Sequence, residues 1–156
     1  MRYRLVAIGR LKRGFHADGC RYYAGRLEAL ARLEVVELKE GRGGDVRAVR
    51  DAESTALLEA AQGRTAARTV AIDEHGRSFG TRDLAAHLDG LELAGDSRLS
   101  LLVGGAEGHA PWLLDRVDEV WRLSDLTLPH ELARLVLLEQ LYRVETLRAG
   151  HPYHRG

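Results

Sequence analysis

Short apolar segments alternate with longer amphipathic segments along the whole chain, and this alternation constrains the fold more than any other feature. The short segments are rich in aliphatic and β-branched residues and predict strands over residues 3–8, 33–38, 69–72, 99–103 and 119–123. Helical spacing in the longer segments predicts helices over residues 16–31, 45–62, 81–91, 112–117 and 129–147. We expect Asp45 and Thr81 to cap two of these helices, Gly63 to follow the end of one, and residues 73–77 to form a loop. Strands that alternate with helices indicate an α/β fold with a mostly parallel sheet, in a single domain over residues 1–156.

Size and cysteine content limit the class of protein. The chain has 156 residues and a mass of 17.3 kDa, enough for one domain with its own core. Its one cysteine, Cys20, excludes an intrachain disulfide, and the sequence shows neither a signal-peptide core nor an apolar run of membrane length. Among the seven histidines only His151 and His154 are close in sequence, and no metal-binding motif is present. We therefore expect a cytoplasmic protein with no membrane contact and no metal.

The charges balance overall but not along the chain. Lys and Arg together number 23, as do Asp and Glu, which argues against binding nucleic acid through bulk positive charge. Residues 1–50 nevertheless hold 12 basic and 6 acidic side chains, a net charge of +6, and the remainder carries −6. Arginine supplies 21 of the 23 cations, which fits either compositional bias or bidentate contacts with phosphate. Loops of the basic half are candidates to contact phosphate, at Arg10, Lys12, Arg13, Lys39 and Arg42.

Three predicted strands end in segments that suit a ligand, after Ile72, Val103 and Leu123. Ligands of open α/β sheets bind at the carboxyl ends of the strands. The glycines of residues 104–108 allow close approach of the backbone to a ligand, although a tight strand-to-helix turn would use the same residues. A Gly-x-Gly-x-x-Gly fingerprint and a P-loop are both absent from the sequence, so a small dinucleotide-dependent reductase and an ATPase are not supported.

The last predicted helix and the segment after it carry two further signals. Apolar residues lie around much of the helix, from Leu132 to Leu147, which favours a symmetric dimer; burial of the helix within one subunit is the alternative. Residues 151–156 hold two histidines, a tyrosine and an arginine. These side chains can exchange protons near neutral pH, stack on a base and bind phosphate, which favours a functional tail over an unstructured end.

Four motifs occur in the order known from one enzyme family: LLVGGAEG at 101–108, LSDLTLPH at 123–130, EQLYR at 139–143 and HPYHR at 151–155. With them the chain resembles, over its whole length, the ribosomal RNA large subunit methyltransferase H family of the SPOUT class. The resemblance implies an α/β knot with a C-terminal trefoil, and a homodimer with shared sites. It also implies transfer of a methyl group from S-adenosyl-L-methionine to N3 of a pseudouridine in 23S rRNA, in the stem-loop at the ribosomal subunit interface. The sequence departs from the family pattern at Ala106, where a proline is familiar, and in the more charged segment 73–77.

The resemblance also implies site residues. Cofactor contacts fall on Ile72, Gly104, Leu123, Ser124, Asp125, Leu126, Thr127 and Leu128, and the catalytic, substrate-side positions are His130, Arg143, Tyr153, His154 and Arg155. We expect His154, with His130 in second place, to remove the N3 proton, the arginines to stabilise negative charge, and Tyr153 to position the base. A dimeric ribosome-binding factor without catalysis is the alternative, and the intact cofactor segments argue against it.

Overall fold

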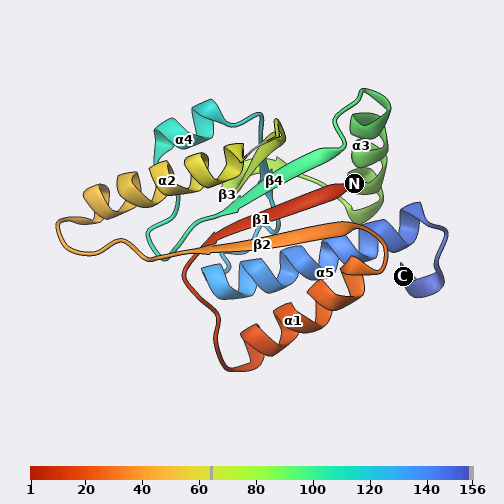
Figure 1. Cartoon of the computed structure of the whole chain (residues 1–156), viewed down its shortest axis with the longest axis horizontal. Helices are drawn as coiled ribbons and strands as arrows, with labels where there is room; N and C mark the ends of the chain where they lie inside the picture. The colour runs from red at the N-terminus through yellow and green to blue at the C-terminus, as the bar shows by residue number, and fades with distance from the viewer. Residues whose placement is uncertain (64, 155–156) are drawn as a thin grey trace.

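One parallel sheet organises the chain. The structure, a computed structural model, describes residues 1–63 and 65–154, the side chain of His154 excepted. Within these residues five strands pair in the order β2-β1-β4-β3-β5, all parallel (Figure 1). They are β1 (Arg2–Ile8), β2 (Arg32–Leu38), β3 (Arg68–Ser78), β4 (Arg98–Val103) and β5 (Glu119–Arg122). The predicted α/β fold with a parallel sheet is confirmed.

Helices cover both faces of this sheet (Figure 1). One face carries α1 (Phe15–Glu28), α3 (Thr81–Leu93) and α5 (His130–Arg148); the other carries α2 (Val46–Gln62) and α4 (Pro111–Arg116). A 3-10 turn, η1 (Pro152–His154), follows α5. Asp45 caps α2 as expected, because its carboxylate accepts a hydrogen bond from the amide of Ala48 at 2.7 Å. In the part of the chain that the structure describes, no helix has the length and apolar character needed to cross a bilayer.

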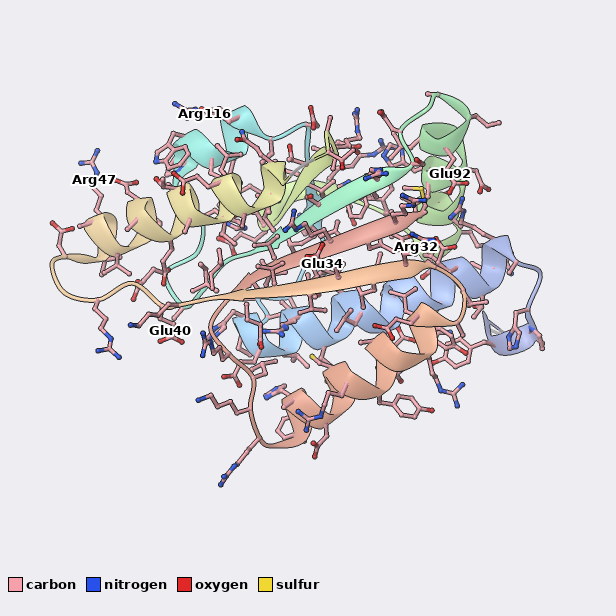
Figure 2. The ribbon with its side chains drawn as sticks, viewed as in Figure 1. Arg32, Glu34, Glu40, Arg47, Glu92 and Arg116 are labelled. Carbon is pink, nitrogen blue, oxygen red and sulfur yellow. The ribbon has the colours of Figure 1, made fainter. Side chains whose placement is uncertain are left out.

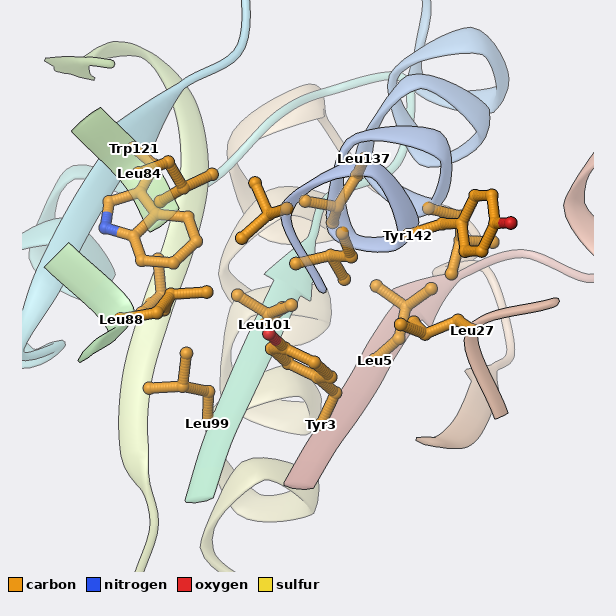
Figure 3. Close-up of a cluster of buried hydrophobic side chains, with 14 of the residues drawn as sticks. Tyr3, Leu5, Leu27, Leu84, Leu88, Leu99, Leu101, Trp121, Leu137 and Tyr142 are labelled. Carbon is orange, nitrogen blue, oxygen red and sulfur yellow. The ribbon is translucent and has the colours of Figure 1, made fainter. Parts of the chain in front are cut away.

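Two apolar cores lie on opposite faces of the central strands. The larger core fills the space between the sheet and α1, α3 and α5, and Figure 3 shows Leu137 and Tyr142 of α5 facing Leu5 and Leu101 of the sheet. The smaller core lies between the sheet and the helices α2 and α4. It includes Val6, the residue of β1 that follows Leu5. Successive residues of a strand point to opposite faces of the sheet. Because helices cover both faces, every residue in the middle of β1 and β4 enters one core or the other, which explains their uninterrupted apolar sequence.

The prediction of a loop over residues 73–77 is wrong. β3 continues to Ser78, and β5 pairs with it on both sides of a bulge, because Ile72 and Arg77 both align with Trp121. Gly76 permits this, since a Cβ at that position would lie 2.6 Å from the backbone of Trp121. The charged side chains of this segment therefore belong to a bulged strand, which aims Asp73 and Glu74 at the carboxyl edge of the sheet.

The structure also bears on two expectations about the helices, and it corrects the first. Thr81 does not cap α3: Gly80 occupies the cap position, and the hydroxyl of Thr81 donates to Gln140 of α5 at 2.9 Å. Much of the apolar surface of α5 is used within the chain, because every residue of α5 is buried or half-buried and the helix packs against α1, α3, η1 and the sheet. Gly19 of α1 lets Leu135 approach closely, with 2.7 Å between a leucine methyl carbon and the position of a Cβ. Leu132 and Val136 of this helix are only half-buried within one chain, so the dimer stays a prediction.

Candidate functional site

A cavity of about 650 Å³ lies at the carboxyl ends of β3, β4 and β5. Residues from the β3 bulge, from the turn after β4 and from the segment that joins β5 to α5 form its wall. The three strand ends singled out in the sequence therefore meet at one place, and the volume suits a small-molecule ligand. Seven of the eight residues predicted to contact the cofactor line this cavity: Ile72, Gly104, Leu123, Ser124, Leu126, Thr127 and Leu128.

The eighth predicted cofactor residue, Asp125, is not part of the cavity wall. It is exposed and forms an ion pair with Arg122, with 3.1 Å between the nitrogen and the oxygen. The neighbouring side chain of Ser124 accepts a hydrogen bond from the amide of Leu126 at 2.9 Å, which closes a local turn. This turn leaves Leu126 77% exposed at the cavity, so an apolar side chain is available there to cover a ligand.

Buried polar side chains of α2 hold the glycine turn that follows β4. The amide of Ala110 donates to the hydroxyl of Ser54 at 2.9 Å, and Ser54 is fully buried. Glu53, also buried, lies so close that its Oε1 would be 3.2 Å from a Cβ at position 105. A side chain at 105 would force its neighbours to shift by a few tenths of an ångström, so glycine suits this close approach, and the turn is packed from the side opposite the cavity.

His109 is a site residue that the sequence did not single out. It lines the cavity, only 7% of it is exposed, and its Nε2 donates to the carbonyl of Leu102 at 3.2 Å. Its Nδ1 is buried and has no hydrogen-bond partner among the described residues. Burial lowers the pKa of His109, and the neighbouring charge of Asp73 only partly opposes this effect. The ring is therefore neutral in the folded protein at neutral pH.

We expect this histidine to make the protein sensitive to acid. Because the pKa of His109 is lower in the folded than in the unfolded chain, the unfolded chain binds more protons as the pH falls below about 6.5. The contribution of the neutral His109 ring to the free energy of unfolding should be fully present above that pH. Below that pH the free energy of unfolding should decrease. Denaturant titrations at pH values from 7.5 to 5, a range of about 2.5 pH units, measure this decrease. The free energy of unfolding should decrease less for His109→Gln than for wild type. The exposed His151→Gln is the control and should behave like wild type; an unchanged pH dependence in His109→Gln would contradict the prediction.

The charge of the cavity is negative. Asp73, Glu74 and Glu107 line it, against one Arg or Lys among the described lining residues, Arg122. Such an arrangement favours a ligand that carries positive charge. The sequence indicated the end of the strand after Ile72 as part of a ligand site, but it predicted a loop there in place of the bulged strand that carries Asp73 and Glu74. No group of three His, Cys, Asp or Glu side chains suited to a metal ion occurs in the described residues.

Nearly the whole chain matches a known family, since residues 1–154 fit the family described as "Predicted SPOUT methyltransferase". The chain belongs to the SPOUT methyltransferase family. Proteins named "Ribosomal RNA large subunit methyltransferase H" are similar from end to end. The protein from Gloeobacter violaceus is 45% identical and the one from Alkalilimnicola ehrlichii 43%, each aligned over 100% of both chains. A protein from Thermus thermophilus is 43% identical over 99% of both chains.

The substrate-side residues predicted for this SPOUT methyltransferase do not all lie together. His130 begins α5 and lines the cavity. Arg143 lies near the other end of the same helix, about 20 Å away at 1.5 Å of rise per residue. Tyr153 lies next to Arg143, and the guanidinium of Arg143 is 5.0 Å from the centre of the tyrosine ring. Arg155 and the side chain of His154 lie outside the described residues.

Tyr153 is held against α5 by aromatic packing. Its ring centre lies 4.6 Å from that of Tyr142, and its hydroxyl donates to Glu139 at 3.4 Å. Glu139 in turn pairs with Arg143 at 2.6 Å. Burial raises the pKa of Tyr153 to about 12, and a hydrogen bond with Tyr23 adds to this effect. Tyr153 is therefore a neutral hydrogen-bonding group, fixed at the end of α5 remote from the cavity of its own chain.

Proposed function

We propose that this chain is an S-adenosyl-L-methionine-dependent methyltransferase that methylates N3 of a pseudouridine in 23S rRNA, in the stem-loop at the ribosomal subunit interface. The observation that carries the proposal is the cavity at the carboxyl ends of β3, β4 and β5, in a chain of the SPOUT family that is 45% identical from end to end to a named large subunit rRNA methyltransferase. A substrate within the ribosome places the protein in the cytoplasm.

The cavity has the properties that this cofactor needs. S-adenosyl-L-methionine carries a positive sulfonium, and the carboxylates of Asp73, Glu74 and Glu107 give the cavity the opposite charge. Gly104 exposes backbone to the ligand, and Leu126 offers an apolar cover. When bound, the cofactor supplies the electrophilic methyl group. The remaining requirements, a base and stabilisation of a developing anion, fall to side chains of the protein.

His130 is the described side chain best placed to move the N3 proton. It lies at the cavity, in the first turn of α5, and imidazole is the side chain most often used as a general base. Arg122 lines the same cavity and is suited to stabilise the imide anion that forms when N3 loses its proton. His154 stays the first candidate for the base, and Arg155 a second cation, on the family motif.

A homodimer would bring the separated groups together. Arg143 and Tyr153 lie about 20 Å from His130 within one chain, so the tail of a second copy is needed at each cavity. α1, which packs beside α5, leaves two aromatic side chains exposed, Phe15 (72%) and Tyr22 (54%). An exposed aromatic pair next to α5 suits an interface between two copies of this surface. The threading of the C-terminal segment as a trefoil knot is part of the same proposal.

The modified base itself tests the function. We expect 23S rRNA from a strain that lacks this protein to carry an unmethylated pseudouridine, and added protein with cofactor should restore the methyl group on ribosomes. Mass analysis of the rRNA fragment measures both results. A non-catalytic binding factor would leave the mass of the base unchanged in the deletion strain. That outcome would overturn the proposed function.

A further inference from the structure

A second cavity, of about 670 Å³, lies at the opposite edge of the sheet from the first. The first residues of β1, β2 and β4 and the end of α2 form its wall, together with the chain that follows α2. β1 has seven residues, so about 20 Å separates this amino edge from the carboxyl edge. The cavity is therefore distinct from the proposed cofactor site.

Among the described residues, four arginines line this second cavity, which we call the arginine groove: Arg2, Arg4, Arg32 and Arg98. Three of them form a row across neighbouring strands, because Arg2 aligns with Arg32 on one side and with Arg98 on the other. Adjacent strands are about 4.8 Å apart, so three guanidinium side chains start from neighbouring points on one face of the sheet. Like charges directly opposite each other destabilise a sheet, so the row needs a counter-charge.

The chain itself supplies little of that counter-charge. Glu34 is the one acidic side chain among the described residues that line the groove, and it pairs with Arg4 at 3.6 Å. For Arg2, Arg32 and Arg98, no ion pair with a described carboxylate lies within 4.0 Å. Figure 2 marks Arg32 and Glu34 along β2. Some arginines elsewhere are neutralised within the chain: Arg148, for example, pairs with Asp89, Glu92 and Glu145.

One donor in the groove is buried without a partner. The Nε of Arg4 makes no hydrogen bond with any described residue. Its guanidinium lies against Gly63, where a Cβ would come within 2.2 Å of Nη1. Arg4 and Arg2 point to the face of the sheet that carries α2, since Tyr3 and Leu5 enter the core of the other face. α2 ends at Gln62, beside Arg4, so the row of three arginines lies past the end of the helix.

We propose that the arginine groove binds phosphate groups of the RNA backbone and anchors the substrate remotely from the methyl-transfer site. The planar guanidinium matches phosphate oxygens in pairs, and several arginines in a row suit a ligand with repeated phosphates. The groove offers no exposed aromatic ring for stacking on a base, since Tyr3 is only 3% exposed among the described lining residues, so the contact is with the backbone. The inference rests on the proposed function, and it supplies the positive charge that the acidic cofactor cavity lacks.

Removal of the row should weaken RNA binding without harming the cofactor site. In the triple variant Arg2→Gln, Arg32→Gln, Arg98→Gln, we expect the affinity for ribosomes from the deletion strain to fall at least about tenfold. The slope of log affinity against log salt should decrease by about 2 to 3, because about one counterion is released per phosphate contact. KM for ribosomes should rise while kcat and the affinity for S-adenosyl-L-methionine stay near wild type.

The control removes the same charge elsewhere. Arg47, Arg82 and Arg116 are exposed on α2, α3 and α4, and two of them are labelled in Figure 2. Their triple change to Gln should leave the salt slope near the wild-type value. A third variant with Lys at positions 2, 32 and 98 keeps the charge and should recover most of the affinity, which separates loss of charge from damage to the sheet.

Four outcomes would overturn the inference, and a fifth would overturn the proposed function on which it rests. A salt slope that is unchanged in the groove variant, an equal loss in the control, or no recovery with Lys would each overturn the inference. Titration of wild type with ATP tests the other source of phosphate: tight binding that the groove variant loses would assign the groove to a free nucleotide and overturn the RNA contact. If wild type itself fails to methylate ribosomes, the proposed function fails. This outcome differs from an active wild type whose groove variant binds ribosomes normally, which would overturn the groove inference alone.

Discussion

Gly104→Trp is expected to abolish the binding of S-adenosyl-L-methionine while the fold is retained. A Cβ at position 104 would lie 3.2 Å from the backbone of Gly108 and 3.3 Å from the ring of His109, so the indole must extend into the cavity of about 650 Å³. The backbone at this position does not need a positive φ, so the substitution adds bulk without backbone strain. We expect the affinity to fall at least about 100-fold, or about 2.8 kcal/mol.

Calorimetry with the purified protein measures this loss directly. Gly104→Ala should lose less affinity for S-adenosyl-L-methionine and should retain measurable binding. Its methyl group requires the neighbouring atoms to shift by only a few tenths of an ångström. Gly90→Trp is the matched control, since Gly90 is exposed on α3 and a Cβ there meets nothing within 4 Å. Wild-type affinity in Gly104→Trp would place the cofactor elsewhere in the molecule.

The elements of the fold were predictable because their signals are local. The strands β1 and β4 are apolar runs, and Asp45 and Gly63 mark the two ends of α2. The bulge in β3 was not predictable in this way, since its charged residues look like a loop. Its pairing partner, Trp121, lies more than forty residues further along the chain.

The site was predictable in part, for the same reason. Ile72, Gly104 and Leu123 follow or end predicted strands, and the carboxyl ends of parallel strands must meet. His109 carries no signal of its own in the sequence, because its character as a buried neutral ring depends on burial by distant segments. The arginine groove could not be predicted from the sequence either, because Arg2, Arg32 and Arg98 become neighbours only through the strand order β2-β1-β4.

Two inactive variants should restore activity to each other if the sites are shared between chains. One variant carries Gly104→Trp, which blocks the cavity but leaves the tail intact. The other lacks residues 151–156 but keeps the cavity, which includes His130. In a heterodimer of the two, the intact tail of the first chain meets the intact cavity of the second. Random mixing makes about half of the dimers mixed, each with one complete site, so about a quarter of wild-type methylation should return.

The geometry of α5 is the reason to expect exchange between chains. Tyr153 is packed against Tyr142 and Arg143, about 20 Å along the helix from His130, so the start of the tail is fixed far from the cavity of its own chain. Methylation of ribosomes by equal amounts of the two variants, unfolded together and refolded, measures the recovery. A mixture of Gly104→Trp with a chain that carries both changes is the control and should stay inactive. If the tail serves its own cavity, the mixture of single variants contains no complete site and no activity returns; if the tail is dispensable, the truncated chain is active alone.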